Sequence, residues 1–246
     1  MRVAAIYDIH GNLPALEAVL EEIHKADVDH LVVGGDVVPG PMPRETLACL
    51  LSVPIPKRYI YGNGEVAVLE QMAGKEPSAV PEPFRPIIRW TVEQLRSDHE
   101  RFLSAWPKTV AVEIDALGEV LFCHATPCSE NETFTRLTPE ERVLPSFQGV
   151  HASVVVCGHT HMQFDRVIGK TRVVNAGSVG MPFGQPGADW LLLGPDIELR
   201  HTSYDLRKAA DRIRVTNYPQ AEDFAERNIL HPPSAERMLE VFSRAQ

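Results

Sequence analysis

Residues 3–12 read VAAIYDIHGN, and they lead from a strand-like run into the first turn of a helix. Small and β-branched side chains up to Tyr7 favour a strand, and Asn12 is placed to cap the helix that follows. Apolar residues then recur at helical spacing, at Leu13, Leu16, Leu20 and Ile23. A second β-branched run covers residues 31–33. The order strand, helix, strand predicts an α/β fold.

The middle of the chain departs from this alternation. A helix over residues 44–51 and a strand over 59–61 continue the pattern, but residues 65–107 are first rich in proline and then helical. We predict one helix there, with an apolar face formed by Ile88, Val92, Leu95, His99 and Phe102. Because this segment interrupts the strands, we interpret it as a helical cap inserted into a single domain of residues 1–246.

Short strands dominate the second half of the chain. Turn signals link some of them into hairpins. The expected strands cover residues 110–114, 119–123, 154–157, 164–168, 171–174, 190–193 and 197–202. Residues 205–246 are expected to form a C-terminal extension of short helices, the last of them capped by Ser234.

Charge and composition argue against several classes of protein. The formal net charge is −9 and the 24 Lys and Arg residues are dispersed, so no basic stripe favours long nucleic acid, although a small nucleotide stays open as a ligand. No run of 18 apolar residues predicts a membrane span. The four cysteines form no C-x-x-C pair and no export signal precedes the first strand, so we expect reduced thiols and a cytoplasmic protein. The sequence gives no indication of oligomeric state.

Metal-capable side chains follow the runs that we interpret as core strands. These are Asp8, His10, Asp36, Asn63, His124, His159 and His161. Side chains at the carboxyl ends of adjacent strands converge in space. Oxygen ligands mixed with imidazoles suit Zn, Mn or Fe better than Ca or Mg, and one aspartate can bridge two ions. The pattern therefore indicates a centre with two divalent metal ions.

Five short motifs, in order along residues 1–205, resemble those of the calcineurin-like metallophosphoesterase family. They are residues 8–12 (DIHGN), Gly35-Asp36, Gly62-Asn63, His124 and residues 158–161 (GHTH). The resemblance implies two mixed sheets packed as a sandwich between helices, in four layers α/β/β/α. It also implies that Asp8, His10 and His161 hold one ion, that Asn63, His124 and His159 hold the other, and that Asp36 bridges them. By the same resemblance Asp36, Asn63 and His124 are the catalytic candidates.

The resemblance implies hydrolysis of a small phosphoester, by water that the metal ions activate for in-line attack. Phosphomonoesters and phosphodiesters both stay open, including nucleotides, dinucleoside polyphosphates and phosphoproteins, whereas the dispersed basic charge argues against a nuclease. One position departs from the family pattern: Gly64 follows Asn63 where a histidine is usual. A metal-binding regulatory protein with little turnover is therefore the alternative.

Several polar residues around these motifs have competing interpretations. Taken alone, His124 would be a satisfied histidine at a strand end. Residues 175–180 resemble a loop that follows the last ligands in this family and approaches the site, and a plain turn between strands is the alternative. His99 is expected to pack in the cap, and Glu65 to support a metal-ligand histidine. We expect Gly64→His, if the side chain fits, to raise turnover of alkyl esters more than that of nitrophenyl esters.

Overall fold

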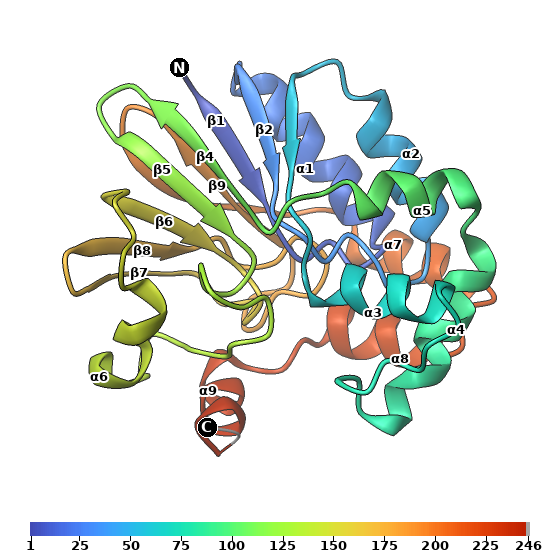
Figure 1. Ribbon diagram of the computed structural model, residues 1–246. Coiled ribbons are helices and arrows are strands. Elements are labelled where there is room, and N and C mark those ends of the chain that lie inside the picture. The colour runs from blue at the N-terminus through green and yellow to red at the C-terminus, as the bar shows by residue number, and fades with distance from the viewer. Residues whose placement is uncertain (245–246) are drawn as a thin grey trace.

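The computed structural model describes residues 1–244, and its strands form two five-stranded mixed sheets. The first sheet has the order β10-β9-β1-β2-β3 and the second β4-β5-β6-β8-β7. Figure 1 shows the two sheets face to face, with helices over the outer side of the first. The expected α/β sandwich of two mixed sheets is therefore confirmed.

The first sheet is parallel in one half, from β1 to β3, and antiparallel in the other, from β10 to β1. Its strands are β1 (Val3–Ile6), β2 (His30–Val33), β3 (Lys57–Tyr59), β9 (Ala188–Leu193) and β10 (Ile197–Thr202). β1 pairs parallel with β2, and antiparallel with β9, which returns from the far end of the chain. The parallel pair places residues 8 and 36 at the same edge of the sheet.

The second sheet is built from hairpins around one central strand. Its strands are β4 (Thr109–Ile114), β5 (Gly118–Cys123), β6 (Val154–Cys157), β7 (Phe164–Ile168) and β8 (Thr171–Asn175). β6 lies parallel to β5 and to β8, so the residues after β5 and β6 emerge at one edge. His124 follows β5 there, and His159 and His161 follow β6.

Alternate residues of β1 explain why two sheets stack. Val3 and Ala5 are buried between the sheets, while Ala4 and Ile6 face the core under the helices. A strand that is apolar on both faces must be covered on both. The helices over the first sheet are α1 (Leu13–Lys25), α2 (Pro43–Ser52) and α7 (Leu206–Arg214). Asn12 caps α1, as expected, because its side-chain oxygen accepts from the Ala15 N–H at 3.2 Å.

Helices fill the interval between β3 and β4. They are α3 (Asn63–Met72), η1 (Glu82–Phe84), α4 (Arg85–Gln94) and α5 (Ser97–Ser104). The prediction of one helix through His99 is wrong, since Leu95 and Arg96 are extended and separate α4 from α5. His99 is the third residue of the second helix, and its Nδ1 accepts from the Arg96 N–H at 3.1 Å. A residue expected to pack in the cap therefore caps a helix instead.

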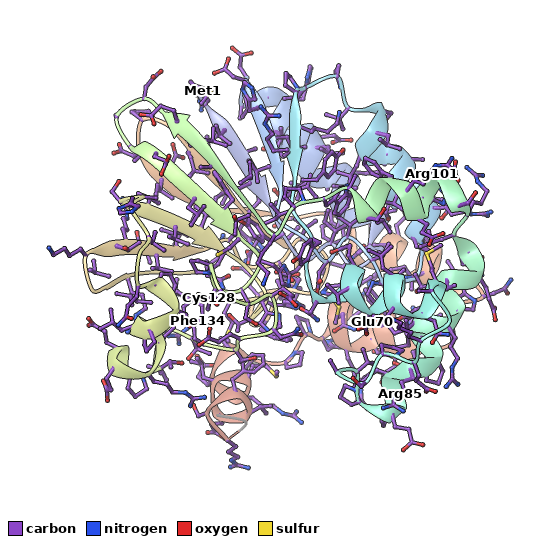
Figure 2. All side chains as sticks on the ribbon, in the orientation of Figure 1. Met1, Glu70, Arg85, Arg101, Cys128 and Phe134 are labelled. Atoms are coloured by element: carbon purple, nitrogen blue, oxygen red, sulfur yellow. The ribbon has the colours of Figure 1, made fainter. Side chains whose placement is uncertain are left out.

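The remaining helices flank the second sheet and follow the last strand. α6 (Glu140–Val143) and η2 (Leu144–Phe147) cover the second sheet, and α8 (Ala221–Phe224), the π-helical turn η3 (Ala225–Leu230) and α9 (Ala235–Arg244) follow α7. Ser234 caps α9 as expected, accepting from the Arg237 N–H at 3.2 Å. Figure 2 shows Glu70 and Arg85 on the helical side of the molecule, apart from Cys128 and Phe134 beside the second sheet. No helix within residues 1–244 is long and apolar enough to cross a membrane.

Candidate metal centre

Most of the predicted metal ligands have a backbone conformation that side chains disfavour. Positive φ angles occur at Asp8, His10, Asp36, His159 and His161, with values from 48° to 66°. Only two other non-glycine residues in 1–244 share this conformation. Left-handed backbone at a residue with a side chain costs free energy and collects at functional sites. The loops after β1, β2 and β6 therefore hold their side chains in a strained arrangement at one edge of the two sheets.

Asp8 is the centre of the cluster and is completely buried. One carboxylate oxygen, Oδ2, accepts from the His159 backbone N–H at 2.8 Å. The other, Oδ1, is buried without a hydrogen-bond partner. An unsatisfied buried acceptor costs about 1–3 kcal/mol, more when it is charged. A cation beside Oδ1 would remove that cost, so this residue fits a metal ligand.

Three histidines face this oxygen, and the Nε2 atom of one of them, His124, lies 3.8 Å from it. The Nε2 atom of His161 lies 3.4 Å from Asp8 Oδ1, and that of His10 lies 3.9 Å from it. The two Nε2 atoms are 3.2 Å apart. Asp8, His10 and His161 thus have one ligand atom each within 4.8 Å of one another, the arrangement of a three-ligand metal site.

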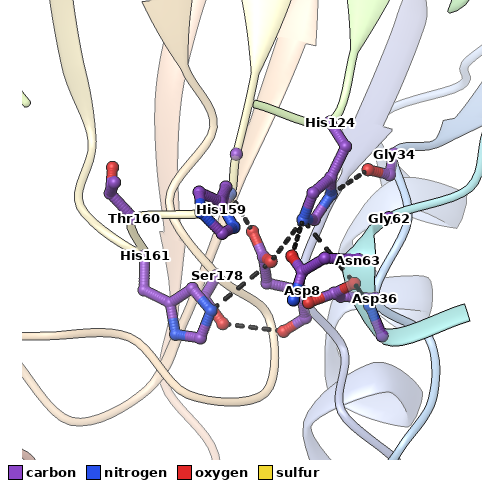
Figure 3. Close-up of polar contacts among 12 residues, drawn as sticks. Asp8, Gly34, Asp36, Gly62, Asn63, His124, His159, Thr160, His161 and Ser178 are labelled. Carbon is purple, nitrogen blue, oxygen red and sulfur yellow. Dashed lines mark hydrogen bonds and ion pairs between the residues drawn. The ribbon is translucent and has the colours of Figure 1, made fainter. Parts of the chain in front are cut away.

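A second group of potential ligands shares Asp8. It combines Asp8 with Asp36 and His124, again within 4.8 Å. Asp36 lies between the two groups: Oδ2 is 3.7 Å from His10 Nε2, and Oδ1 is 3.6 Å from His124 Nε2. Asn63 joins the second group, with its side-chain oxygen 3.1 Å from His124 Nε2. Figure 3 shows the side chains of Asp8, Asp36, Asn63 and His124 close together.

His159 lies beside this cluster but belongs to neither group. Its ring packs edge-on against His124, with centroids 5.3 Å apart. Its Nε2 atom is 3.3 Å from the hydroxyl of Thr133, in the loop after β5. The structure therefore brings six of the seven predicted ligands into contact and leaves the ring of His159 at the edge, where a ligand role stays a prediction.

Backbone carbonyls fix the orientation of two histidine rings. His124 Nδ1 lies 2.9 Å from the Gly34 carbonyl, and His161 Nδ1 lies 2.9 Å from the Met181 carbonyl. A carbonyl oxygen only accepts, so each Nδ1 carries the hydrogen and donates it. Nε2 is then the atom that faces the cluster. This arrangement orients histidine rings in many metal sites.

The charges in the cluster shift each other's pKa values. Burial lowers the pKa of His124, but Asp36 and Asp8 outweigh it and leave the pKa raised. The pKa of His161 is raised because Asp8 outweighs burial. Burial raises the pKa of Asp8, yet His161 and His124 hold it well below its usual range. Burial, and then His124, lower the pKa of His159 to about 4. The Asp8 carboxylate thus remains ionised and favours a nearby positive charge.

Glu65 supports the site through backbone groups and not through a histidine. It was predicted to hold a histidine, but its carboxylate accepts from four backbone N–H groups, those of Gly62, Asp36, Val37 and Val38, at 2.7–3.1 Å. Glu65 is the third residue of α3 and is completely buried. It therefore ties the start of α3 to the loop that carries Asp36.

Gly64 leaves no room for a side chain. A Cβ atom there would lie 2.3 Å from the Val38 carbonyl oxygen and 2.9 Å from Asp36 Oδ1. Its backbone N–H instead donates to Asp36 Oδ1 at 2.7 Å. The expectation that Gly64→His adds a proton donor therefore meets a steric obstacle, since the Val38 backbone would have to move.

The loop at residues 175–180 is more than a turn between strands. Ser178 Oγ donates to the Asp8 carbonyl at 2.7 Å, and the Gly180 N–H donates to the same carbonyl at 2.9 Å. A Cβ atom at Gly180 would lie 1.9 Å from the Ile9 carbonyl, so only glycine permits this approach. The loop clamps the backbone of Asp8, a role that sequence had left undecided.

A cavity of about 440 Å³ opens beside the cluster. His10, Asp36, Asn63 and Gly64 form part of its lining. The rest of the lining comes from Pro39, Ala67 and Met181, and from residues 79–88 and 218–233. The sequence did not predict the contribution of 218–233, because no ligand motif marks that segment.

Comparisons with known proteins assign the chain to a family. Residues 1–194 match the model of the calcineurin-like phosphoesterase superfamily domain. An uncharacterised protein of Methanocaldococcus jannaschii is 27% identical over 239 residues, covering 89% of this chain and 94% of the other. The chain therefore belongs to the calcineurin-like phosphoesterase superfamily.

Solved structures share the fold. A hypothetical protein from Pyrococcus horikoshii OT3 superposes with a TM-score of 0.76 at 19% identity, covering 95% of this chain and 99% of that one. A metallophosphoesterase from Sphaerobacter thermophilus gives a TM-score of 0.70 at 24% identity, covering 92% and 97%. Together with the buried Asp and His groups, the family defines a phosphoesterase fold with a candidate divalent metal site.

Proposed function

We propose that the protein hydrolyses the phosphate ester of a small molecule at a centre of two divalent metal ions. The observation that carries this proposal is the pair of ligand groups around the unpaired Oδ1 of Asp8, with Asp36 turning one oxygen toward each group. Asp8, His10 and His161 would hold one ion, Asn63, His124 and His159 the other, and Asp36 both. Mn, Fe or Zn suits this mixture of imidazole and oxygen donors.

Bound metal ions would neutralise phosphate charge and lower the pKa of an attacking water molecule. The residues of this chain supply the geometry. Gly34 and Met181 fix two rings, Glu65 and Gly64 position Asp36, and Ser178 holds the backbone of Asp8. Rigid support of this kind keeps a reactive arrangement in place without reorganisation during the reaction.

The alternative is a metal-binding protein with little turnover, and Gly64 is the observation in its favour. No side chain extends from this position, and none fits there. A protein without a proton donor is most impaired on esters with poor leaving groups, by about 10²- to 10⁴-fold. The leaving group of a nitrophenyl ester needs little protonation. An enzyme without a proton donor should therefore still hydrolyse nitrophenyl esters, whereas a binding protein without activity should not.

The test uses protein stripped by a chelator and reloaded with Mn²⁺, Fe²⁺ or Zn²⁺. We expect at least one metal to support turnover of nitrophenyl phosphate or bis-nitrophenyl phosphate, and Asp8→Asn to abolish it. Asp165→Asn is the control, because Asp165 lies on β7 and pairs with Arg172 at 2.6 Å, away from the cluster. Absence of turnover with every metal and both esters, in protein that binds metal, would favour the binding protein.

A further inference from the structure

We infer that the cavity beside the metal cluster binds an apolar, uncharged organic group carried on a single phosphate. This inference rests on the proposed function and names its substrate class. The cavity and the cluster are continuous, because His10, Asp36 and Asn63 line both. A phosphate held at the cluster would therefore direct its organic group into the cavity.

The walls of the cavity are largely apolar. One side consists of the chain before and within α4, and the other of the segment after α7. The apolar lining residues are Pro39, Ala67, Ala79, Val80, Pro81, Phe84, Ile87, Ile88, Met181, Phe224 and Pro233. Tyr218 adds an aromatic ring that packs edge-on against Trp90 at 5.3 Å between centroids. A cavity of about 440 Å³ lies within the range typical of sites for small organic ligands.

Phe84 marks the mouth of this cavity. Its side chain is 51% exposed, and it is the only aromatic among the strongly exposed large apolar side chains of residues 1–244. Exposed aromatic surface at the rim of a pocket is available to pack against a ligand. The exposure of Phe84 therefore accords with a site that gains apolar contacts when its ligand binds.

The cavity offers no free cation for a second phosphate. Among the described residues that line it, Arg227 is the only Lys or Arg, and its Nε is 2.8 Å from the carboxylate of Asp223. Arg85 and Arg89 on α4 both pair with Glu76. Polyphosphate groups are recognised through unpaired Arg and Lys side chains. Of the substrates left open by the sequence, a dinucleoside polyphosphate is therefore the one that this cavity disfavours.

The segment at residues 218–233 lies beyond the part of the chain that matches the family model, residues 1–194. The ligand groups lie entirely within the matched part. The candidate metal ligands thus lie in the part of the chain that matches the family model, whereas one wall of the cavity comes from a segment outside that part. This wall would therefore determine which organic group the substrate carries.

The test measures binding of alkylphosphonates, which carry a phosphate-like group that is not hydrolysed. Calorimetry with Mn²⁺-loaded protein compares methyl-, butyl- and hexylphosphonate. We expect affinity to increase about four-fold for each added methylene, the effect of burying apolar surface. A terminal carboxylate on the same chain, as in 6-phosphonohexanoate, is expected to cancel this gain. Equal affinity along the alkyl series, or stronger binding of the carboxylate, would overturn the inference.

Phe84→Ala supplies the matched variant. It should weaken hexylphosphonate about five-fold and change methylphosphonate less than two-fold, because only the longer chain reaches the rim. Leu51→Ala is the control: Leu51 is 53% exposed and lies on α2, outside the cavity. Equal effects of Phe84→Ala on both phosphonates would contradict the assignment.

Turnover of nitrophenyl phosphate by the same Mn²⁺-loaded protein tells the two proposals apart. If nitrophenyl phosphate is hydrolysed but phosphonate affinity does not depend on alkyl chain length, only the cavity assignment is overturned. Graded affinities without turnover overturn hydrolysis and leave the cavity as a ligand site. No binding of any phosphonate, together with no turnover of nitrophenyl phosphate, overturns both.

Discussion

The carboxylate of Glu65 accepts a hydrogen bond from the backbone N–H of Asp36 at 2.8 Å, 29 residues earlier in the chain. The same carboxylate binds Gly62 at the start of α3, so the helix and the loop after β2 form one rigid unit. Asp36 and Asn63, candidate ligands from different parts of the sequence, are thereby fixed relative to each other. Their separation depends on a residue that need not touch metal or substrate.

Glu65→Gln should therefore reduce stability and metal content together. An amide has one acceptor oxygen and turns an NH₂ group toward backbone donors, so buried N–H groups lose their partners. We expect the free energy of unfolding to fall by about 2–4 kcal/mol, measured by urea denaturation of the metal-free protein. Glu70→Gln on the same helix is the control. Unchanged stability of Glu65→Gln would show that these hydrogen bonds are not important.

Gly64→Ala tests the close approach between α3 and the loop after β2. The new Cβ atom would lie 2.3 Å from the Val38 carbonyl, so the backbone must shift and displace Asp36. We expect a loss of about 1–3 kcal/mol in stability and weaker metal binding. Thermal unfolding and metal titration measure both. Wild-type behaviour in both measurements would mean that the loop yields easily, and Gly64→His would again be a reasonable test of proton donation.

Metal binding should release protons. The pKa values of His124 and His161 are raised in the metal-free protein by Asp36 and Asp8, which favours the protonated form of both rings. A metal ion requires the unprotonated Nε2, and its apparent affinity should therefore fall as the pH decreases. Calorimetric titration at pH 6.5 in two buffers of different ionisation enthalpy measures the protons released, on the order of one per chain or more. An identical heat in both buffers would contradict this prediction.

Local patterns in the sequence account for the elements and for the identity of most site residues. Asn12 caps α1 as predicted, and the predicted strands at 154–157 and 197–202 match β6 and β10. The strand expected at 59–61 lies instead at 57–59, because the Tyr61 N–H donates to the Pro107 carbonyl rather than to the sheet. Pro107 lies 46 residues after Tyr61, and the periodicity of apolar residues does not predict contacts over such a distance.

The same limit applies to the site. The strand-end motifs identify Asp8, Asp36 and His124. Parallel pairing of β1 and β2 brings the two aspartates together, whereas His124 follows β5 of the second sheet and reaches them because the two sheets stack. The roles of Glu65 and Ser178 depend on contacts between distant segments, and no short pattern shows them. The interruption of the helix at Leu95 was missed because the apolar spacing continues across it. The wall formed by 218–233 was missed for a related reason, since a cavity is defined by packing rather than by a motif.

The central claim is that two ions share Asp36, and metal content measures it most directly. Elemental analysis of Mn²⁺-reloaded wild-type protein, after removal of free metal, should give two ions per chain. Asp36→Asn should give clearly fewer, while Asp165→Asn should retain both. Two ions retained in Asp36→Asn would contradict the shared ligand, and a single ion in the wild-type protein would contradict the dinuclear centre.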